Sequence, residues 1–160
     1  MGLYDIPFRR MDGTSTSLAE HRDDVVLVVN VASRCGHTPQ YAALERLQEK
    51  FESRGFTVLG FPSNQFLQEL GSNEAIAEFC TTKYGVTFPV LDRVRVNGRN
   101  EHPLFHELKK TPDAEGKAGR VAWNFEKFVV LPGGQVRRFR TATEPDDPAI
   151  VDLIESHLPR

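Results

Sequence analysis

The strongest hydrophobic pattern in the chain is a run of apolar residues from Val25 to Val31, interrupted only by Asn30. An almost continuous apolar run, without polar positions in alternation, is typical of a strand that is buried on both faces of a sheet. Residues 56–61 repeat this pattern farther along the chain. We therefore expect two central strands with a connecting segment between them.

Two segments carry apolar residues at helical spacing. Thr38 and Pro39 have the residue types of an N-cap and a first helical residue, and Gly55 is the expected end of the helix that follows. A second helix is expected over residues 73–84. The core-facing residues of the two helices are Tyr41, Leu44, Leu47 and Phe51 in the first, and Ile76, Phe79, Cys80 and Tyr84 in the second.

Shorter signals complete the pattern at both ends of the chain. Asp12-Gly13 separates strand-like residues 6–10 and 14–18, which predicts an N-terminal β-hairpin. The alternation of strands and helices predicts an α/β fold with a central mixed β-sheet flanked by helices. The remaining expected elements are a helix over 103–110, strands over 128–131 and 136–139 around a Pro-Gly-Gly turn, and a last helix that begins at Asp147-Pro148.

The composition narrows the class of protein. With 160 residues, we expect a single domain over residues 1–160. A net charge of −2 and a hydrophobic fraction of 39% argue against a disordered chain, a nucleic-acid-binding surface and a basic membrane patch. The longest apolar stretch is too short to span a bilayer, so we expect a cytoplasmic protein with a small substrate.

Cys35 is the first candidate for chemistry, because it follows the predicted buried strand and precedes the predicted helix. Free backbone N–H groups and the helix dipole favour an anion at such a position, and the thiolate is the nucleophilic form of cysteine. The neighbouring Arg34 adds a positive charge. The position alone does not separate this interpretation from a small buried residue in a tight turn.

Three motifs in this sequence resemble those of the glutathione peroxidase family. They are residues 30–38 (Asn-Val-Ala-Ser-Arg-Cys-Gly-His-Thr), 59–66 (Leu-Gly-Phe-Pro-Ser-Asn-Gln-Phe) and 123–128 (Trp-Asn-Phe-Glu-Lys-Phe). The resemblance extends over essentially the whole chain. It implies a thioredoxin-like fold, reduction of hydrogen peroxide and organic hydroperoxides as part of the response to oxidative stress, and no cofactor.

The same resemblance implies the residues of the site. Cys35 is then the peroxidatic nucleophile, surrounded by N–H donors from Gln68, Trp123 and Asn124. Such donors stabilise a thiolate and can orient a peroxide oxygen. The loop that holds Gln68 is one residue shorter than is usual in the family, so Gln65 is the alternative.

The resemblance also implies how the cycle closes. Cys35 becomes a sulfenic acid on reaction with peroxide, and Cys80 lies close to where thioredoxin-dependent members carry their resolving cysteine. The family's other common cysteine is replaced by Ser63. We expect a Cys35–Cys80 disulfide that thioredoxin reduces, with local unwinding around Cys80 because its helix face is apolar. Alternatively, Cys80 is an inert core residue and an external thiol such as glutathione resolves Cys35.

Other functions remain open from the sequence. The same sulfur chemistry could serve a peroxide sensor that oxidises a partner protein, and the fold could serve a non-redox binding domain. We expect no metal site, because His37 lacks further ligands at suitable spacing and His102 and His106 have the places of a helix cap and a surface residue. The short segment 110–123 lacks the insertion that tetrameric family members use, which implies a monomer.

Overall fold

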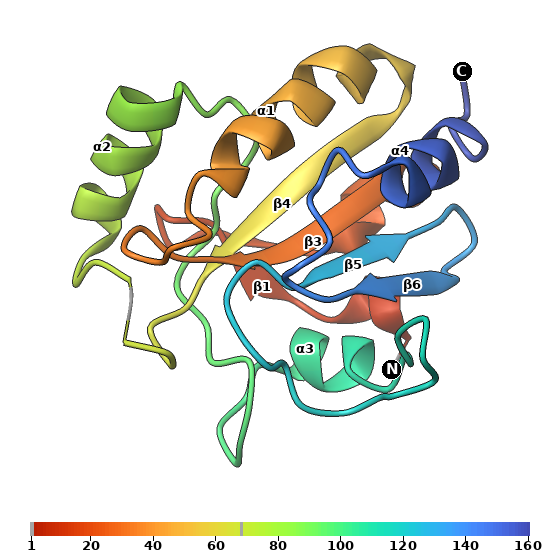
Figure 1. Cartoon of the computed structure of the whole chain (residues 1–160). Helices are drawn as coiled ribbons and strands as arrows, with labels where there is room; N and C mark the ends of the chain where they lie inside the picture. The colour runs from red at the N-terminus through yellow and green to blue at the C-terminus, as the bar shows by residue number, and fades with distance from the viewer. Residues whose placement is uncertain (1, 68) are drawn as a thin grey trace.

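The computed structural model describes residues 2–67 and 69–160, and a four-stranded sheet lies at its centre (Figure 1). The strand order is β4-β3-β5-β6, in which β3 (Val25–Val31) and β4 (Phe56–Pro62) run parallel. β5 (Lys127–Val130) pairs antiparallel with β3, and β6 (Val136–Phe139) pairs antiparallel with β5. The predicted mixed sheet is therefore confirmed.

The apolar run of β3 is explained by its place in this sheet. All seven of its residues are buried, and successive side chains point to opposite faces. Val25, Leu27, Val29 and Val31 belong to the apolar cluster on one face, whereas Val26 and Val28 belong to the cluster on the other. A strand with two covered faces has no position for a solvated side chain, which is why alternation is missing.

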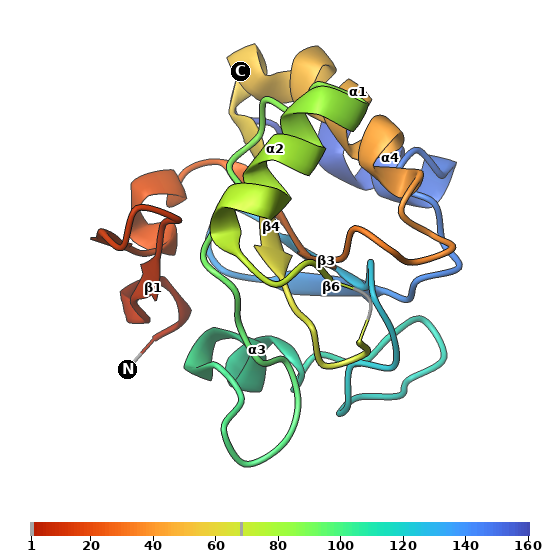
Figure 2. The same ribbon diagram turned by 90° about the vertical axis from the view of Figure 1, so that its left-hand side faces the viewer.

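Helices cover both faces of the sheet. α1 (Gln40–Phe51) and α4 (Pro148–Glu155) pack on one face, and α3 (Pro103–Leu108) packs on the other (Figure 1). α2 (Asn73–Tyr84) lies beside α1 at the periphery of the molecule, as Figure 2 shows. Only Ile76 and Cys80 of α2 are fully buried. Its attachment to the core is therefore slight.

The N-terminal hairpin is confirmed, although its strands are shorter than expected. β1 (Phe8–Arg9) and β2 (Ser15–Thr16) pair antiparallel. Gly13 in the turn has a φ of 89°, a left-handed conformation that glycine adopts without strain. The Phe8 ring meets Phe61 edge to face, with centroids 5.1 Å apart, and this contact joins the hairpin to β4. Three short 3₁₀ turns complete the fold: Leu3–Asp5, Leu18–His21 and Glu52–Arg54.

The helix boundaries agree with the sequence where the caps are local. α2 covers the predicted residues, because the Ser72 hydroxyl accepts a hydrogen bond from the Ala75 N–H (3.2 Å) and Gly85 ends the helix with a φ of 59°. α4 ends at Glu155, one turn earlier than its apolar pattern suggests. β5 begins one residue earlier than predicted, at Lys127.

Candidate active site

Cys35 lies in the loop that joins the carboxyl end of β3 to α1. The Thr38 hydroxyl organises this loop by donating a hydrogen bond to the Ala32 carbonyl and accepting one from the Cys35 N–H, both at 2.9 Å. The Thr38 N–H also donates to the Cys35 carbonyl (3.0 Å). The prediction that Thr38 caps the helix is therefore wrong: its hydroxyl is used within the loop, and α1 begins at Gln40.

The sulfur of Cys35 is nearly buried and faces a backbone donor. Its residue is 7% exposed, and Sγ accepts a hydrogen bond from the His37 N–H (3.3 Å). The backbone N–H of His37 is thus a hydrogen-bond donor available to negative charge on the sulfur. The side chains of Arg34 and His37 are exposed, so His37 contributes through its backbone.

Trp123 and Asn124 are held at the end of β3 by Asn30. The Asn30 side-chain amide donates to the Trp123 carbonyl (3.0 Å), and its Oδ1 accepts from the Glu126 N–H (3.1 Å). The Asn30 carbonyl accepts from the Phe125 N–H (2.6 Å). Three hydrogen bonds from one residue of β3 therefore bring segment 123–126 to the strand end that leads to Cys35.

The two predicted donors of this segment differ in exposure. Asn124 is completely buried, and its carbonyl accepts a hydrogen bond from the Thr141 hydroxyl (2.6 Å). Trp123 is 38% exposed, and its ring lies against Phe66 with centroids 5.0 Å apart. Phe125 adopts a φ of 60°, an unfavourable conformation for a bulky residue, and such residues concentrate at functional sites.

The glutamine assignment depends on the loop after β4. Gln68, the first choice, lies outside the described residues. The side chain of Gln65, the alternative, binds a different segment: its amide nitrogen donates to the Asn97 carbonyl (2.8 Å), and its Oε1 accepts from the N–H groups of Val96 and Asn97. In this conformation Gln65 fastens the loop to residues 96–97 and makes no hydrogen bond to Cys35.

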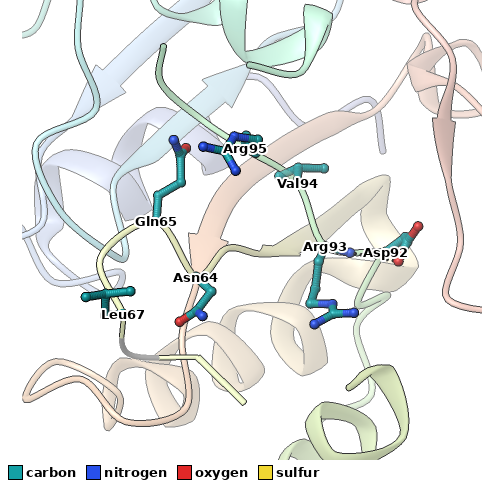
Figure 3. Close-up of a pocket in the computed structure, with 7 residues that line it drawn as sticks. All are labelled: Asn64, Gln65, Leu67, Asp92, Arg93, Val94 and Arg95. Atoms are coloured by element: carbon teal, nitrogen blue, oxygen red, sulfur yellow. Dashed lines mark hydrogen bonds between the residues drawn. The ribbon is translucent and has the colours of Figure 1, made fainter. Parts of the chain in front are cut away.

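A cavity of about 630 Å³ opens beside this loop. Figure 3 shows residues of the loop on one side of the cavity and Arg93 and Arg95, from the segment between α2 and α3, on another. Leu67 is 85% exposed, and it adopts a φ of 59°. The mouth of this region therefore combines positive charge with an exposed apolar side chain. The lining residues are Asn64, Gln65, Leu67, Asp92, Arg93, Val94 and Arg95.

Cys80 is buried in α2, at 2% exposure, and both cysteines carry free thiols. Cys35 and Cys80 belong to the same apolar cluster on the α1 face of the sheet. Burial raises the pKa of the Cys80 thiol, the neighbouring Tyr41 hydroxyl partly offsets this rise, and the charge of Glu69 adds to it. The Cys80 sulfur is therefore protonated and shielded in this state.

The histidines occupy the places predicted for them. Nδ1 of His102 accepts a hydrogen bond from the Leu104 N–H (3.0 Å) at the start of α3, and burial lowers the pKa of His102. His106 is on the surface, 3.8 Å from Glu101. Within residues 2–67 and 69–160, no cluster of three or more histidine, cysteine or acidic residues has the arrangement of a metal site. Over the same residues, no helix has the length and apolarity needed to cross a bilayer.

Comparisons with a family profile, with known sequences and with solved structures all lead to the same protein family. The profile of a family described as glutathione peroxidase matches residues 3–109. The chain is similar to the thioredoxin/glutathione peroxidase BtuE of Escherichia coli, with 43% identity in an alignment that covers 92% of each protein. The crystal structure of Trgpx in apo form covers 98% of this chain and 95% of its own, with a TM-score of 0.78 and 36% identity.

A more distant solved structure shows the general fold. A thiol:disulfide interchange protein of the thioredoxin family from Chlorobium tepidum has a TM-score of 0.60 at 19% identity and covers 95% of this chain and 92% of its own. The predicted thioredoxin-like fold is thus confirmed.

No role is predicted from the sequence for two residues that the geometry places at this site, although Asn30 begins the first motif. Asn30 is a polar residue in an otherwise apolar buried strand, and this contrast is the signal that could have identified it. The Oε1 of Glu69 accepts a hydrogen bond from the Ser33 N–H (3.0 Å), and nothing in the sequence pattern of its loop distinguishes this residue.

Proposed function

The chain belongs to the glutathione peroxidase family and is a peroxidase, and we propose that Cys35 is the sulfur that attacks the peroxide. The observation that carries this proposal is the position of Sγ: it is nearly buried at the end of β3 and accepts the His37 N–H. A thiolate is stabilised by such a donor and remains protected from bulk water.

The reaction begins with attack of the Cys35 thiolate on one peroxide oxygen. The S–O bond forms as the O–O bond breaks, and the second oxygen leaves with a proton as water or an alcohol. Cys35 is then a sulfenic acid. We assign to Gln68, Trp123 and Asn124 the N–H groups that stabilise the thiolate and the leaving oxygen. The anchoring of segment 123–126 by Asn30 supports this assignment for two of the three.

Cys80 is our candidate for the resolving thiol. Its sulfur attacks the Cys35 sulfenic acid, an S–S bond forms, and the oxygen leaves as water. Cys80 is buried within a continuous helix in the reduced protein. A disulfide requires Cα atoms within about 7 Å, so we propose that α2 unwinds locally around Cys80 as the disulfide forms.

Thioredoxin is the proposed reductant of this disulfide. The name of the E. coli relative includes both thioredoxin and glutathione, and an intramolecular disulfide is opened by exchange with a dithiol protein. We place the cycle in the cytoplasm, where thioredoxin keeps protein thiols in the reduced form. We also propose a monomer, because segment 110–123 is short and folds against its own chain through Arg138.

A second scheme is favoured by the burial of Cys80. If α2 stays folded, a small external thiol such as glutathione must enter and reduce the Cys35 sulfenic acid directly. The two schemes share the first step and differ in the reductant.

The decisive experiment measures peroxide consumption with thioredoxin, thioredoxin reductase and NADPH, and separately with glutathione. Cys35→Ser should abolish consumption under both conditions, because no other residue replaces the nucleophile. Cys80→Ser should consume one equivalent of peroxide and then stop with thioredoxin. Sustained turnover of Cys35→Ser would refute the assignment of Cys35 as the nucleophile. Full turnover of Cys80→Ser with glutathione would favour the second scheme.

A further inference from the structure

Three buried polar atoms near the two cysteines have no hydrogen-bond partner among the described residues. They are the Ser33 hydroxyl, the Tyr41 hydroxyl and Oε2 of Glu69. An unsatisfied buried polar group costs about 1–3 kcal/mol. The Ser33 side chain lies beside Glu69, and the Tyr41 hydroxyl lies beside Cys80. The three atoms come from three segments: the Cys35 loop, α1 and the approach to α2.

The two carboxylate oxygens of Glu69 differ in their hydrogen bonding: Oε1 accepts two backbone hydrogen bonds, whereas Oε2 accepts none among the described residues. The residue is only 6% exposed, and its Oε1 accepts hydrogen bonds from the N–H groups of Ser33 (3.0 Å) and Leu70 (2.8 Å). Its own N–H donates to Oδ1 of Asn64 (3.1 Å). This arrangement ties the carboxylate to the Cys35 loop and leaves Oε2 without a partner in the interior.

Cys80 and Tyr41 are the neighbours of this carboxylate. The charge of Glu69 raises the pKa of Cys80 and also that of Tyr41, although burial is the larger cause for both. Burial raises the pKa of Glu69 itself, and hydrogen bonding from Ser33 and Leu70, followed by the positive charge of Arg93, partly offsets the rise. The charged or titratable groups that face the cluster are thus Tyr41, Tyr84, Cys80 and Arg93.

We propose that Glu69 accepts the proton of the Cys80 thiol in the resolving step, with Oε2 as the receiving atom. This inference rests on the proposed function, since it requires Cys80 to be the resolving thiol. A buried thiol is a poor nucleophile until its proton is removed, and the only carboxyl oxygen that lacks a hydrogen bond in this part of the described structure belongs to Glu69.

The step balances in atoms and charge. Glu69 takes the proton from Cys80, and the thiolate attacks the sulfur of the Cys35 sulfenic acid. The S–S bond forms as the S–O bond breaks, and the leaving hydroxide takes the proton from Glu69 to become water. Glu69 is a carboxylate again, so it is ready for the next turnover. The Tyr41 hydroxyl assists by stabilising the thiolate.

The test compares Glu69→Gln with Glu78→Gln. Glutamine keeps an oxygen for the Ser33 and Leu70 N–H groups but cannot take a proton, whereas Glu78 lies on the exposed surface of α2 and controls for loss of one charge. Rapid mixing with hydrogen peroxide gives two rates, Cys35 oxidation and disulfide formation, read by tryptophan fluorescence and quenched mass analysis.

Glu69→Gln should slow disulfide formation by about 100-fold, the usual contribution of a general base, and should slow Cys35 oxidation far less. Glu78→Gln should leave the ratio of the two rates as it is in the wild type. An unchanged ratio in Glu69→Gln would overturn the proposal. A wild-type protein that consumes peroxide but forms no Cys35–Cys80 disulfide would instead refute Cys80 as the resolving thiol of the proposed function.

The wild-type protein provides a second measurement that does not depend on the variant folding. Carbon-13 labelling of glutamate side chains allows the Glu69 carboxyl to be titrated by NMR. The rate of disulfide formation should rise with pH at the midpoint of that titration, because the carboxylate is the active form. A rate that ignores the ionisation of Glu69 would overturn the proposal.

Discussion

Asn30 is the residue on which the assembly of this site depends. A fully buried amide in a strand of valines would be costly if unpaired, but its three bonds to segment 123–126 satisfy both its backbone carbonyl and its side chain. Segment 123–126 is thereby fixed to the sheet, although more than ninety positions separate it from Asn30 in the sequence. This buried polar residue therefore holds segment 123–126 in a fixed position against β3.

Replacing Trp123 with phenylalanine tests the indole donor. Phenylalanine retains a ring to pack against Phe66 but lacks the indole N–H. Cys35 oxidation should slow by about 100-fold, as expected for the loss of one donor to a developing anion. Stopped-flow fluorescence is not available once the tryptophan is gone, so the rate is followed by mass analysis of quenched samples.

Phe66→Leu is the matched control for this prediction. It alters the packing on the Trp123 ring and leaves the indole N–H in place. Its oxidation rate should stay much closer to that of the wild type. If the Trp123→Phe variant oxidises as fast as Phe66→Leu, the indole hydrogen has no part in the reaction.

At the scale of single residues, the sequence identifies candidate residues but not their hydrogen-bond partners. Cys35 is a candidate because it lies between a predicted strand and a predicted helix and within a motif that resembles those of the family. The prediction that Thr38 caps α1 is wrong because its hydroxyl donates to the Ala32 carbonyl within the loop. The residue type alone does not determine which of these two interactions forms. Glu69 could not be found, because its role depends on the fold bringing Ser33, Cys80 and Tyr41 around it.

At the scale of elements, α1 and α2 differ in how firmly they are held. Both have twelve residues, yet α1 buries eight of them and α2 only Ile76 and Cys80. Few buried contacts give an element a low local unfolding free energy. This contrast agrees with the proposal that α2 opens locally to release Cys80, while α1 stays folded and holds the Cys35 loop in place.

Hydrogen–deuterium exchange tests this contrast. In the reduced protein, amides of α2 should exchange faster than those of α1, because fewer buried contacts oppose their opening. After one equivalent of peroxide, protection around Cys80 should fall further, while α1 should keep its protection. In Cys80→Ser the same treatment should leave α2 unaltered. Full protection of α2 in the disulfide-bonded protein would contradict local unwinding.

The hairpin of β5 and β6 carries a buried ion pair that organises the segment before Trp123. Arg138 pairs with Glu126, whose side chain is completely buried. The remaining guanidinium N–H groups donate to four backbone carbonyls, those of Lys109, Thr111, Gly119 and Arg120, at 2.7–3.3 Å. One side chain of β6 thus satisfies both ends of the 109–120 segment.

Arg138→Ala should destabilise the protein by about 3–5 kcal/mol, because it leaves the Glu126 carboxylate buried with reduced compensation. Arg137→Ala, at the exposed neighbouring position, should change stability by less than about 0.5 kcal/mol. Urea denaturation under reducing conditions gives both values. Equal stability of the two variants would show that the buried pair does not hold this segment.

The bounds of elements were predictable where the signals are local. α2, β3 and β6 agree with their sequence patterns, since a cap, a continuous apolar run and a glycine turn each act within a few residues. The strand order and the arrangement of the ion pair around Glu126 depend on contacts between distant segments. Hydrophobic periodicity carries no information about such pairings.

At the scale of the whole molecule, Lys127 links stability to pH. The side chain is fully buried in β5, and its Nζ donates to the carbonyls of Thr141 (3.2 Å) and Thr143 (2.6 Å). Burial lowers the pKa of Lys127 to about 7, although the charges of Glu144 and Glu126 oppose this shift. In the unfolded chain the pKa of a lysine returns to about 10.4.

The sign of the pH dependence follows from these two values. Between about pH 7 and pH 10 the unfolded chain holds a proton that folded Lys127 has lost, so the free energy of unfolding rises with pH. The slope is at most about 1.4 kcal/mol per pH unit for one proton. Below pH 7 both states are protonated, so Lys127 adds no slope there and its burial cost is present in full.

Replacing Lys127 with methionine should remove this slope while keeping a side chain of similar length in the buried site. Urea unfolding at pH 6, 7, 8 and 9 gives the free energy of unfolding of the wild type and of Lys127→Met. The difference between the two values removes the contribution of Cys80 and of other groups that ionise in both proteins. The difference should change by less than about 0.5 kcal/mol from pH 6 to 7 and should then shift in favour of the wild type by about 1 kcal/mol per unit. Lys83→Met, on the exposed end of α2, should follow the wild type throughout. Parallel curves for wild type and Lys127→Met would mean that the buried lysine keeps its proton, held by the two carbonyls and the nearby carboxylates.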